Sequence, residues 1–253
     1  MSTEGLGRVE KVLESVDFFK PRSTRRKFLT AIAAGGAAAA AGAAGLGRVL
    51  PASADAGTVV GFGNAAVGAE KIAVAFYSNA LGVSSDFGVP ADLAKGTLLN
   101  SAHRDYFMAA RNQEANHLAT LQSALGLSFP ANTFAFPAGT FASAPAMLAI
   151  GEALENIFIG AYLGAVLAAA TAGGSLGILV AEVAAEICGV ECAHRVLIRD
   201  IAGEDPPNDR FYEGDSSVPG PSGDLGNSGI RSHVYATGDQ AVAALLALGI
   251  SAS

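Results

Sequence analysis

The feature that most constrains the fold is a spacing of glutamate and histidine that occurs twice. The chain has only four histidines, and two of them follow a glutamate by three residues, in EANH (Glu114 and His117) and ECAH (Glu191 and His194). On a helix, residues three apart project from one face, so each pair can reach one ion. Chance predicts about 0.2 such pairs in a chain of this composition. The repeat therefore needs a cause.

A second spacing is also duplicated. Tyr77 follows Glu70 by seven residues, and Tyr162 follows Glu155 by seven. Seven residues make nearly two helical turns, so each tyrosine is expected on the same helix face as its glutamate. The chain thus reads as two matching halves, each with a Glu/Tyr helix followed by a Glu/His helix.

Helical signals cover four segments of the chain, and each ends at or before a glycine. The first helix is predicted at about 64–81, and the second begins between 90 and 100 and runs to 125. The third runs from 143 or 145 to 170, and the fourth covers 175–203 with Ser175 as N-cap. The segment 127–145 between the second and third helices has three prolines and no charge, so it cannot continue a helix. It predicts a long apolar crossover on the bundle surface. A short final helix is predicted at 239–249.

The arrangement of glutamates, EANH and ECAH on four helices with a long crossover resembles the ferritin-like superfamily of dimetal carboxylate proteins, over about residues 60–203. The resemblance implies an all-α four-helix bundle with a short C-terminal helix. It implies six metal ligands, with Glu114 and Glu191 bridging two ions and one further glutamate capping each ion. The implied ligands are Glu70, Glu114, His117, Glu155, Glu191 and His194.

The chemistry of these side chains agrees with the resemblance. Four carboxylates meeting in a bundle core repel one another, and two divalent cations neutralise them. Oxygen ligands with two imidazoles suit iron first and manganese second. Open coordination positions would admit oxygen or peroxide. Tyr77 and Tyr162 are expected to hydrogen-bond the ligands and take part in catalysis, although core tyrosines with satisfied hydroxyls are an equal alternative.

Three further glutamates lie near these ligands in the sequence. Glu152 lies close to Glu155 in helical rotation and is a substitute ligand candidate, whereas Glu182 and Glu186 point away from Glu191 and are excluded.

The remaining histidines and the two cysteines are expected to lie outside the metal site. His103 is expected in a core or loop contact, and His233 in solvent within the polar tail. Cys188 and Cys192 lie four apart on one helix, which is a poor geometry for a mutual disulfide, so they are expected as small core residues.

The N-terminus has the pattern of an export signal. STRRKFLT at 23–30, followed by an Ala/Gly-rich stretch at 31–46, resembles a twin-arginine signal. We expect cleavage near Ala54 or Ala56, giving a signal at 1–56, a bundle at 57–203 and a C-terminal loop and docking helix at 204–253. A retained anchor helix is the alternative. The signal makes the chain most similar to the exported, desiccation-associated ferritin-like subgroup and predicts a periplasmic or extracellular location.

The net charge of the chain limits the kinds of partner that it can bind. The whole chain carries a net charge of −7; cleavage after residue 54 leaves eight Lys and Arg and nineteen Asp and Glu, a net charge of −11. No basic face is left for nucleic acid. The mature chain is expected to lack a membrane span and to form a homo-oligomer.

The predicted function is an exported dimetal oxidoreductase acting on oxygen, peroxide or ferrous iron. The alternatives are a non-catalytic stress-protection or surface protein on the same bundle, and manganese-dependent peroxide disproportionation.

Overall fold

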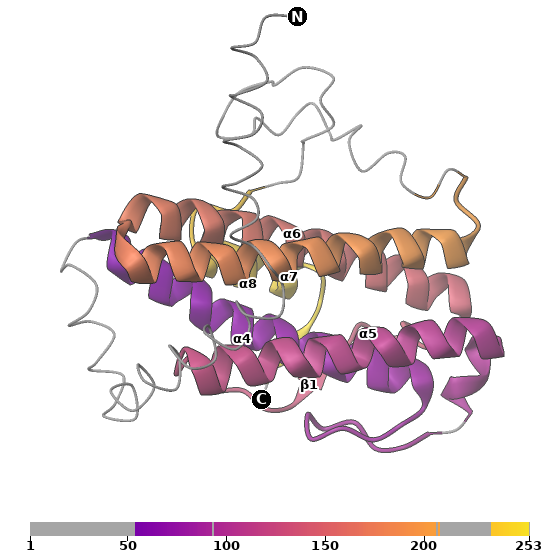
Figure 1. Cartoon of the computed structure of the whole chain (residues 1–253). Coiled ribbons are helices and arrows are strands. Elements are labelled where there is room, and N and C mark those ends of the chain that lie inside the picture. The colour runs from indigo at the N-terminus through magenta and orange to yellow at the C-terminus, as the bar shows by residue number, and fades with distance from the viewer. Residues whose placement is uncertain (1–53, 93, 206, 208–233, 253) are drawn as a thin grey trace, which may run out of the picture.

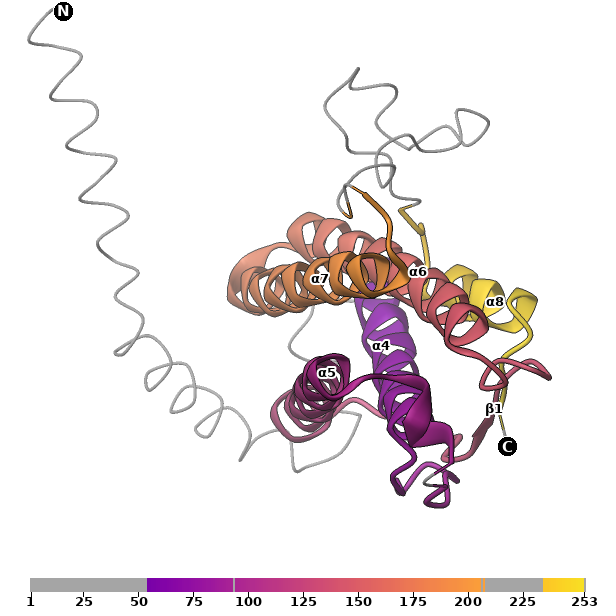
Figure 2. The same ribbon diagram turned by 90° about the vertical axis from the view of Figure 1, so that its right-hand side faces the viewer.

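Four long antiparallel helices form the body of the molecule. The computed structural model describes residues 54–92, 94–205, 207 and 234–252. The four helices are α4 (Ala54–Leu81), α5 (Ser101–Ala119), α6 (Ala144–Ala172) and α7 (Gly174–Ala202). Helices α6 and α7 pack as one hairpin, and α4 contacts both α5 and α6 (Figures 1 and 2). The predicted all-α four-helix bundle is confirmed.

Short elements complete the fold. A 3-10 turn precedes α5 at Lys95–Leu98, and a single π-helical stretch extends α5 over Thr120–Ala124. The predicted C-terminal helix is present as α8 (Gly238–Ala247). Strand β1 (Phe134–Ala135) in the crossover pairs antiparallel with β2 (Ser251–Ala252), a contact that the sequence did not predict.

Local signals set most helix ends. Helix α4 stops where predicted because Gly82 adopts φ 68°, and a β-carbon there would lie only 2.2 Å from the Asp92 carbonyl oxygen. The Ser143 hydroxyl caps α6 by accepting from the Ala146 amide. The predicted Ser175 cap is wrong: Gly173, at φ 69°, serves as the C-cap of α6 and the N-cap of α7, so α7 begins at Gly174.

Helix α4 begins ten residues earlier than predicted. Glycines at 61 and 63 weaken local helix propensity there, but tertiary packing supports the helix. Phe62 is buried, and the α-carbons of Gly63 and Gly164 allow close approach, since added β-carbons would meet Leu127 and Phe62 within 3 Å. Residues 1–53 of the predicted signal (1–56) lie outside the described residues, and the cleavage sites at Ala54 and Ala56 fall in the first turn of α4.

The crossover between α5 and α6 is tied to α4 by one lysine. The Lys71 ammonium donates to the Phe129 carbonyl at 2.8 Å, the Ala131 carbonyl at 3.1 Å and the Asn132 side-chain oxygen at 2.7 Å. Lys71 is 4% exposed. Because it directly follows Glu70, this lysine holds the crossover beside a candidate metal ligand.

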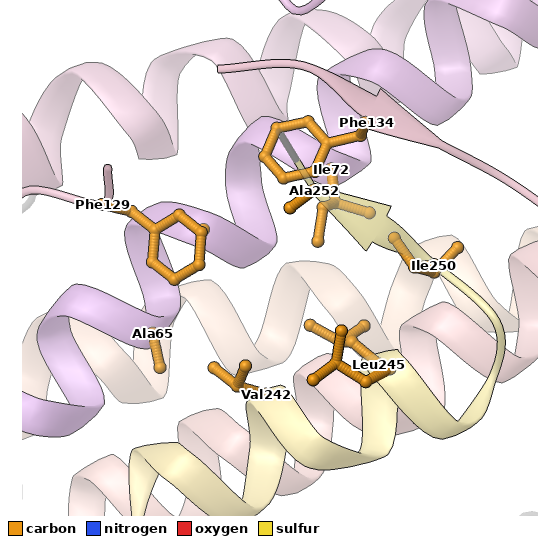
Figure 3. A pocket seen from close by; sticks show the side chains of 10 residues that line it. Ala65, Ile72, Phe129, Phe134, Val242, Leu245, Ile250 and Ala252 are labelled. Atoms are coloured by element: carbon orange, nitrogen blue, oxygen red, sulfur yellow. The ribbon is translucent and has the colours of Figure 1, made fainter. Parts of the chain in front are cut away.

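Helix α8 packs on α4 and α6, on the side away from α5 and α7 (Figure 2). Figure 3 shows Val242 and Leu245 of α8 facing α4, with Phe129 and Phe134 of the crossover above them. A small apolar pocket is left between these elements. The C-terminal segment thus closes one flank of the bundle by apolar contact and the β1–β2 pair.

Two helices, α4 over Val59–Leu81 and α6 over Ala144–Ala172, are long and apolar enough to cross a membrane by length and composition. The most apolar window of α4 is 78% buried inside the protein and that of α6 is 56% buried. Each helix also carries one buried glutamate, Glu70 or Glu155. Both are core helices of the bundle.

Candidate metal centre

The four long helices bring four glutamates and two histidines to one place in the bundle core. The glutamates are 0–2% exposed. Six side chains separated by up to 124 positions in the sequence meet there, and all six are the ligands named from the spacing: Glu70, Glu114, His117, Glu155, Glu191 and His194.

These six residues form two overlapping groups. One consists of Glu70, Glu114, His117 and Glu191, and the other joins Glu114 and Glu191 with Glu155 and His194. Within each group, one ligand atom per residue lies within 4.8 Å of the others. The geometry is consistent with two cations, one in each group, that share Glu114 and Glu191 as ligands.

The shared carboxylates present one oxygen to each imidazole. Glu114 Oε2 is 3.1 Å from His117 Nδ1, and its Oε1 is 2.9 Å from His194 Nδ1. Glu191 does the same, with Oε1 at 3.5 Å from His117 Nδ1 and Oε2 at 3.3 Å from His194 Nδ1. This is the orientation that a pair of bridging carboxylates requires.

The outer glutamates each face only one imidazole. Glu70 Oε2 lies 3.4 Å from His117 Nδ1, and Glu155 Oε1 lies 3.8 Å from His194 Nδ1. Each also accepts a hydrogen bond from a buried tyrosine, Tyr162 for Glu70 and Tyr77 for Glu155. The spacing placed each tyrosine on the face of its own glutamate; in the structure its hydroxyl bonds the glutamate of the other half.

Burial and mutual repulsion dominate the electrostatics of the acids. Burial, followed by the charge of Glu191, raises the pKa of Glu114 and that of Glu155 well above the ordinary range. Burial would also raise the pKa of Glu191, but the two imidazoles, whose Nδ1 atoms lie 3.5 and 3.3 Å from its oxygens, lower it to about 2. Without cations the cluster therefore holds protons.

The pKa values of both histidines are also raised, but here burial acts against the shift. Burial alone would lower the pKa of His117, but its hydrogen bond with Glu114 and the nearby carboxylates of Glu191 and Glu70 raise it to about 12. The same competition raises the pKa of His194, where Glu191 and Glu155 are the main carboxylates. Burial raises the pKa of Tyr77 and of Tyr162, so both hydroxyls stay protonated donors.

Several buried polar atoms of the cluster form no hydrogen bond with suitable geometry. Across the part of the chain that the structure describes, these include Glu70 Oε2, Glu114 Oε1, Glu155 Oε2, both Glu191 carboxylate oxygens and His194 Nδ1. Buried polar groups are normally satisfied. Cations at the two groups would supply the missing partners, so the donor set fits two metal ions.

The other acid and histidine considered as candidates, Glu152 and His103, do not join the cluster. Glu152 is not a substitute ligand: its Oε1 accepts from Arg195 Nη2 at 3.0 Å and Arg199 Nη1 at 2.7 Å. His103 lies at the start of α5, where its amide donates to the Asn100 side chain that caps the helix. His233 lies outside the described residues.

The cysteines are free, as expected. Cys188 is buried and its thiol lies 3.9 Å from the Ile159 carbonyl oxygen, whereas Cys192 is partly buried.

Two residues around the cluster carried no signal in the sequence. Gln113 Oε1 lies 2.8 Å from His194 Nε2, and Lys71 holds the crossover. Gln113 directly precedes Glu114, so helical periodicity turns it to another face. Only the approach of α7 to α5 makes it a neighbour of His194.

Comparison with known proteins agrees with this geometry. No curated protein and no solved structure gave a match. The model of one family, described as the ferritin-like domain, matches residues 58–204, which include most of α4, all of α5 to α7 and all six clustered side chains. The chain belongs to the ferritin-like domain family.

Proposed function

We propose that this protein binds two divalent cations at the Glu/His cluster and, with them bound, is an oxidoreductase that acts on oxygen, peroxide or ferrous iron. The observation that carries the proposal is the pair of buried carboxylates, Glu114 and Glu191, that each direct one oxygen to either imidazole. An acid cluster with 0–2% exposure has a high cost unless it is protonated or bound to cations.

The ligand chemistry favours iron, with manganese second. Each group offers three carboxylates and one imidazole, with no sulfur ligand, and such hard donors suit these two metals. A pair of such ions, when bound, supplies one-electron steps for the reduction of oxygen or peroxide. The two ligand groups would hold such ions as a pair, because they share Glu114 and Glu191.

Two tyrosines of the chain orient the outer ligands. Tyr162 donates to Glu70 Oε1, which leaves Oε2 facing His117. Tyr77 donates to Glu155 Oε1, the oxygen that also faces His194. Because burial keeps both hydroxyls protonated, they position these ligands. We assign them a positioning role and place direct contact with the substrate at the open side of His117, whose side chain is 14% exposed.

The proposed location rests on the N-terminal sequence. The twin-arginine pattern at 23–30 supports export of the folded, metal-loaded protein to the periplasm or the outside of the cell. We propose that the exported protein belongs to the desiccation-associated subgroup and works as a homo-oligomer. Oxygen or peroxide is the proposed small-molecule partner.

The test starts with the metal content of the purified protein. We expect two iron or manganese ions per chain, oxygen uptake when ferrous iron is added to the wild type, and loss of both in Glu114→Ala. Gln122→Ala, at the exposed end of the same helix, should keep both.

Three outcomes separate the candidates. Two bound ions with no oxygen or peroxide turnover would select a non-catalytic role, in which the metal only raises the melting temperature. Peroxide disproportionation with manganese and not with iron would select manganese-dependent chemistry. A chain that binds neither metal would contradict the proposal.

A further inference from the structure

The two nitrogens of the His194 ring face different surroundings. Its Nδ1 lies among Glu114, Glu155 and Glu191, at 2.9–3.8 Å from their nearest oxygens. Its Nε2 lies 2.8 Å from Gln113 Oε1. An amide oxygen can only accept a hydrogen bond, so this contact keeps the proton on Nε2.

The position of that proton decides which nitrogen can bind a cation. With Nε2 protonated, the neutral ring has its lone pair on Nδ1, aimed at the carboxylates. The Tyr77 ring fixes the plane of the imidazole, because it packs edge-on with centroids 5.8 Å apart and an interplanar angle of 68°. Gln113 and Tyr77 together hold His194 in the tautomer and orientation that binding requires.

His117 lacks this support. Within the described residues the structure gives its Nε2 no hydrogen-bond partner, and its side chain is 14% exposed, against 4% for His194. Its Nδ1 faces Glu70, Glu114 and Glu191. The two imidazoles therefore occupy equivalent positions in the duplicated pattern but differ in preorganisation and in access to solvent.

We propose that Gln113 is a positioning residue that makes the two metal positions unequal. The group of His194 takes the first cation and holds it more tightly, because its histidine is preorganised. The group of His117 fills second and exchanges its cation faster, because it lies on the open side. This inference rests on the proposed dimetal function.

The experiment is an anaerobic titration of the metal-free protein with Mn²⁺ at fixed pH, with free Mn²⁺ counted by electron paramagnetic resonance. The wild type should bind two ions in two resolved steps. Gln113→Leu should weaken the first step by about tenfold or more, since partners that orient metal-bound histidines contribute 10–100-fold to affinity. The second step should not change.

Two variants make the result specific. Gln113→Glu keeps an acceptor oxygen for Nε2, so it should restore the tight first step, which a loss of packing would not do. Asn112→Leu places the same side chain on the adjacent exposed position of α5 and should titrate like the wild type. Thermal unfolding of each metal-free variant checks that all of them fold, as expected for exposed positions.

The outcomes distinguish this inference from the proposed function. If the wild type binds two ions and Gln113→Leu weakens neither step or both equally, the role of Gln113 is wrong while the dimetal function stands. Failure of Gln113→Glu to restore the first step would also overturn it. If the wild type binds no metal, the proposed function fails first.

Discussion

The Tyr77 hydroxyl donates to Glu155, a residue 78 positions further along the chain, and Tyr162 donates to Glu70 in return. Each half of the duplicated pattern thus supplies the tyrosine that holds the outer glutamate of the other half. The exchange connects α4 to α6 at the level of the candidate metal centre. It makes the placement of the outer carboxylates depend on the packing of the two halves.

Removing one of these hydroxyls should destabilise the metal-free protein. Tyr77→Phe leaves the buried Glu155 oxygen without its donor, and an unsatisfied buried group costs roughly 1–3 kcal/mol. Urea unfolding followed by circular dichroism measures the difference. Tyr106→Phe is the matched control, since that side chain is 52% exposed. Equal stabilities for the two variants would show that the hydrogen bond does not hold Glu155.

Replacing a shared glutamate should remove more bound ions than replacing an outer one. Glu70→Ala removes a side chain of one group only, so we expect one ion per chain to remain. Glu114→Ala removes a side chain common to both groups and should abolish binding of both ions. Metal analysis after gel filtration gives the stoichiometry. A loss of one ion in both variants would rule out a bridging role for Glu114.

The stability of the metal-free protein should fall as pH rises. His117 has a pKa raised from 6.5 to about 12, so its contribution is complete below pH 6.5 and declines above it. The raised pKa values of Glu114 and Glu155 act in the same direction above their ordinary 4.5, because the folded state binds the extra protons. Glu191, with a pKa of about 2, contributes stability that is lost only as pH falls from 4.5 towards 2.

Melting temperatures measured from pH 5 to pH 9 test this expectation. The metal-free protein should lose stability across the range, whereas the metal-loaded protein should gain, because protons no longer compete with the cations for the ligands. A metal-free protein that becomes more stable towards pH 9 would contradict the proposed protonation of the cluster.

Lys71 should be needed for the order of the crossover. Lys71→Met keeps the length of the side chain but removes the buried ammonium that donates to three partly exposed acceptors. Since hydrogen bonds of charged groups contribute the most, we expect a loss of about 1–3 kcal/mol. Hydrogen exchange in residues 127–136 should also accelerate. Lys95→Met is the control, since its side chain is 36% exposed and its contacts are longer, at 3.4 and 3.9 Å. Unchanged exchange in the crossover would show that Lys71 does not anchor it.

The sequence by itself determined the helices and the faces that they present. Helical rotation is a local property, so the spacing of Glu114 and His117, and of Glu191 and His194, was enough to put each pair on one face. Gly82 and Gly203 set the ends of α4 and α7 through their own backbone conformations, at φ 68° and 83°. If such acids are buried together, their mutual repulsion favours bound cations.

Only the tertiary structure decided which side chains meet across the helices. The partners of Tyr77, Lys71 and Gln113 lie 58 to 81 positions from them in the chain, and no local periodicity specifies such pairs. The early start of α4 has the same origin, since burial of Phe62 outweighs the glycines beside it. The difference between the two imidazoles also arises here, because identical local spacings were packed against different neighbours.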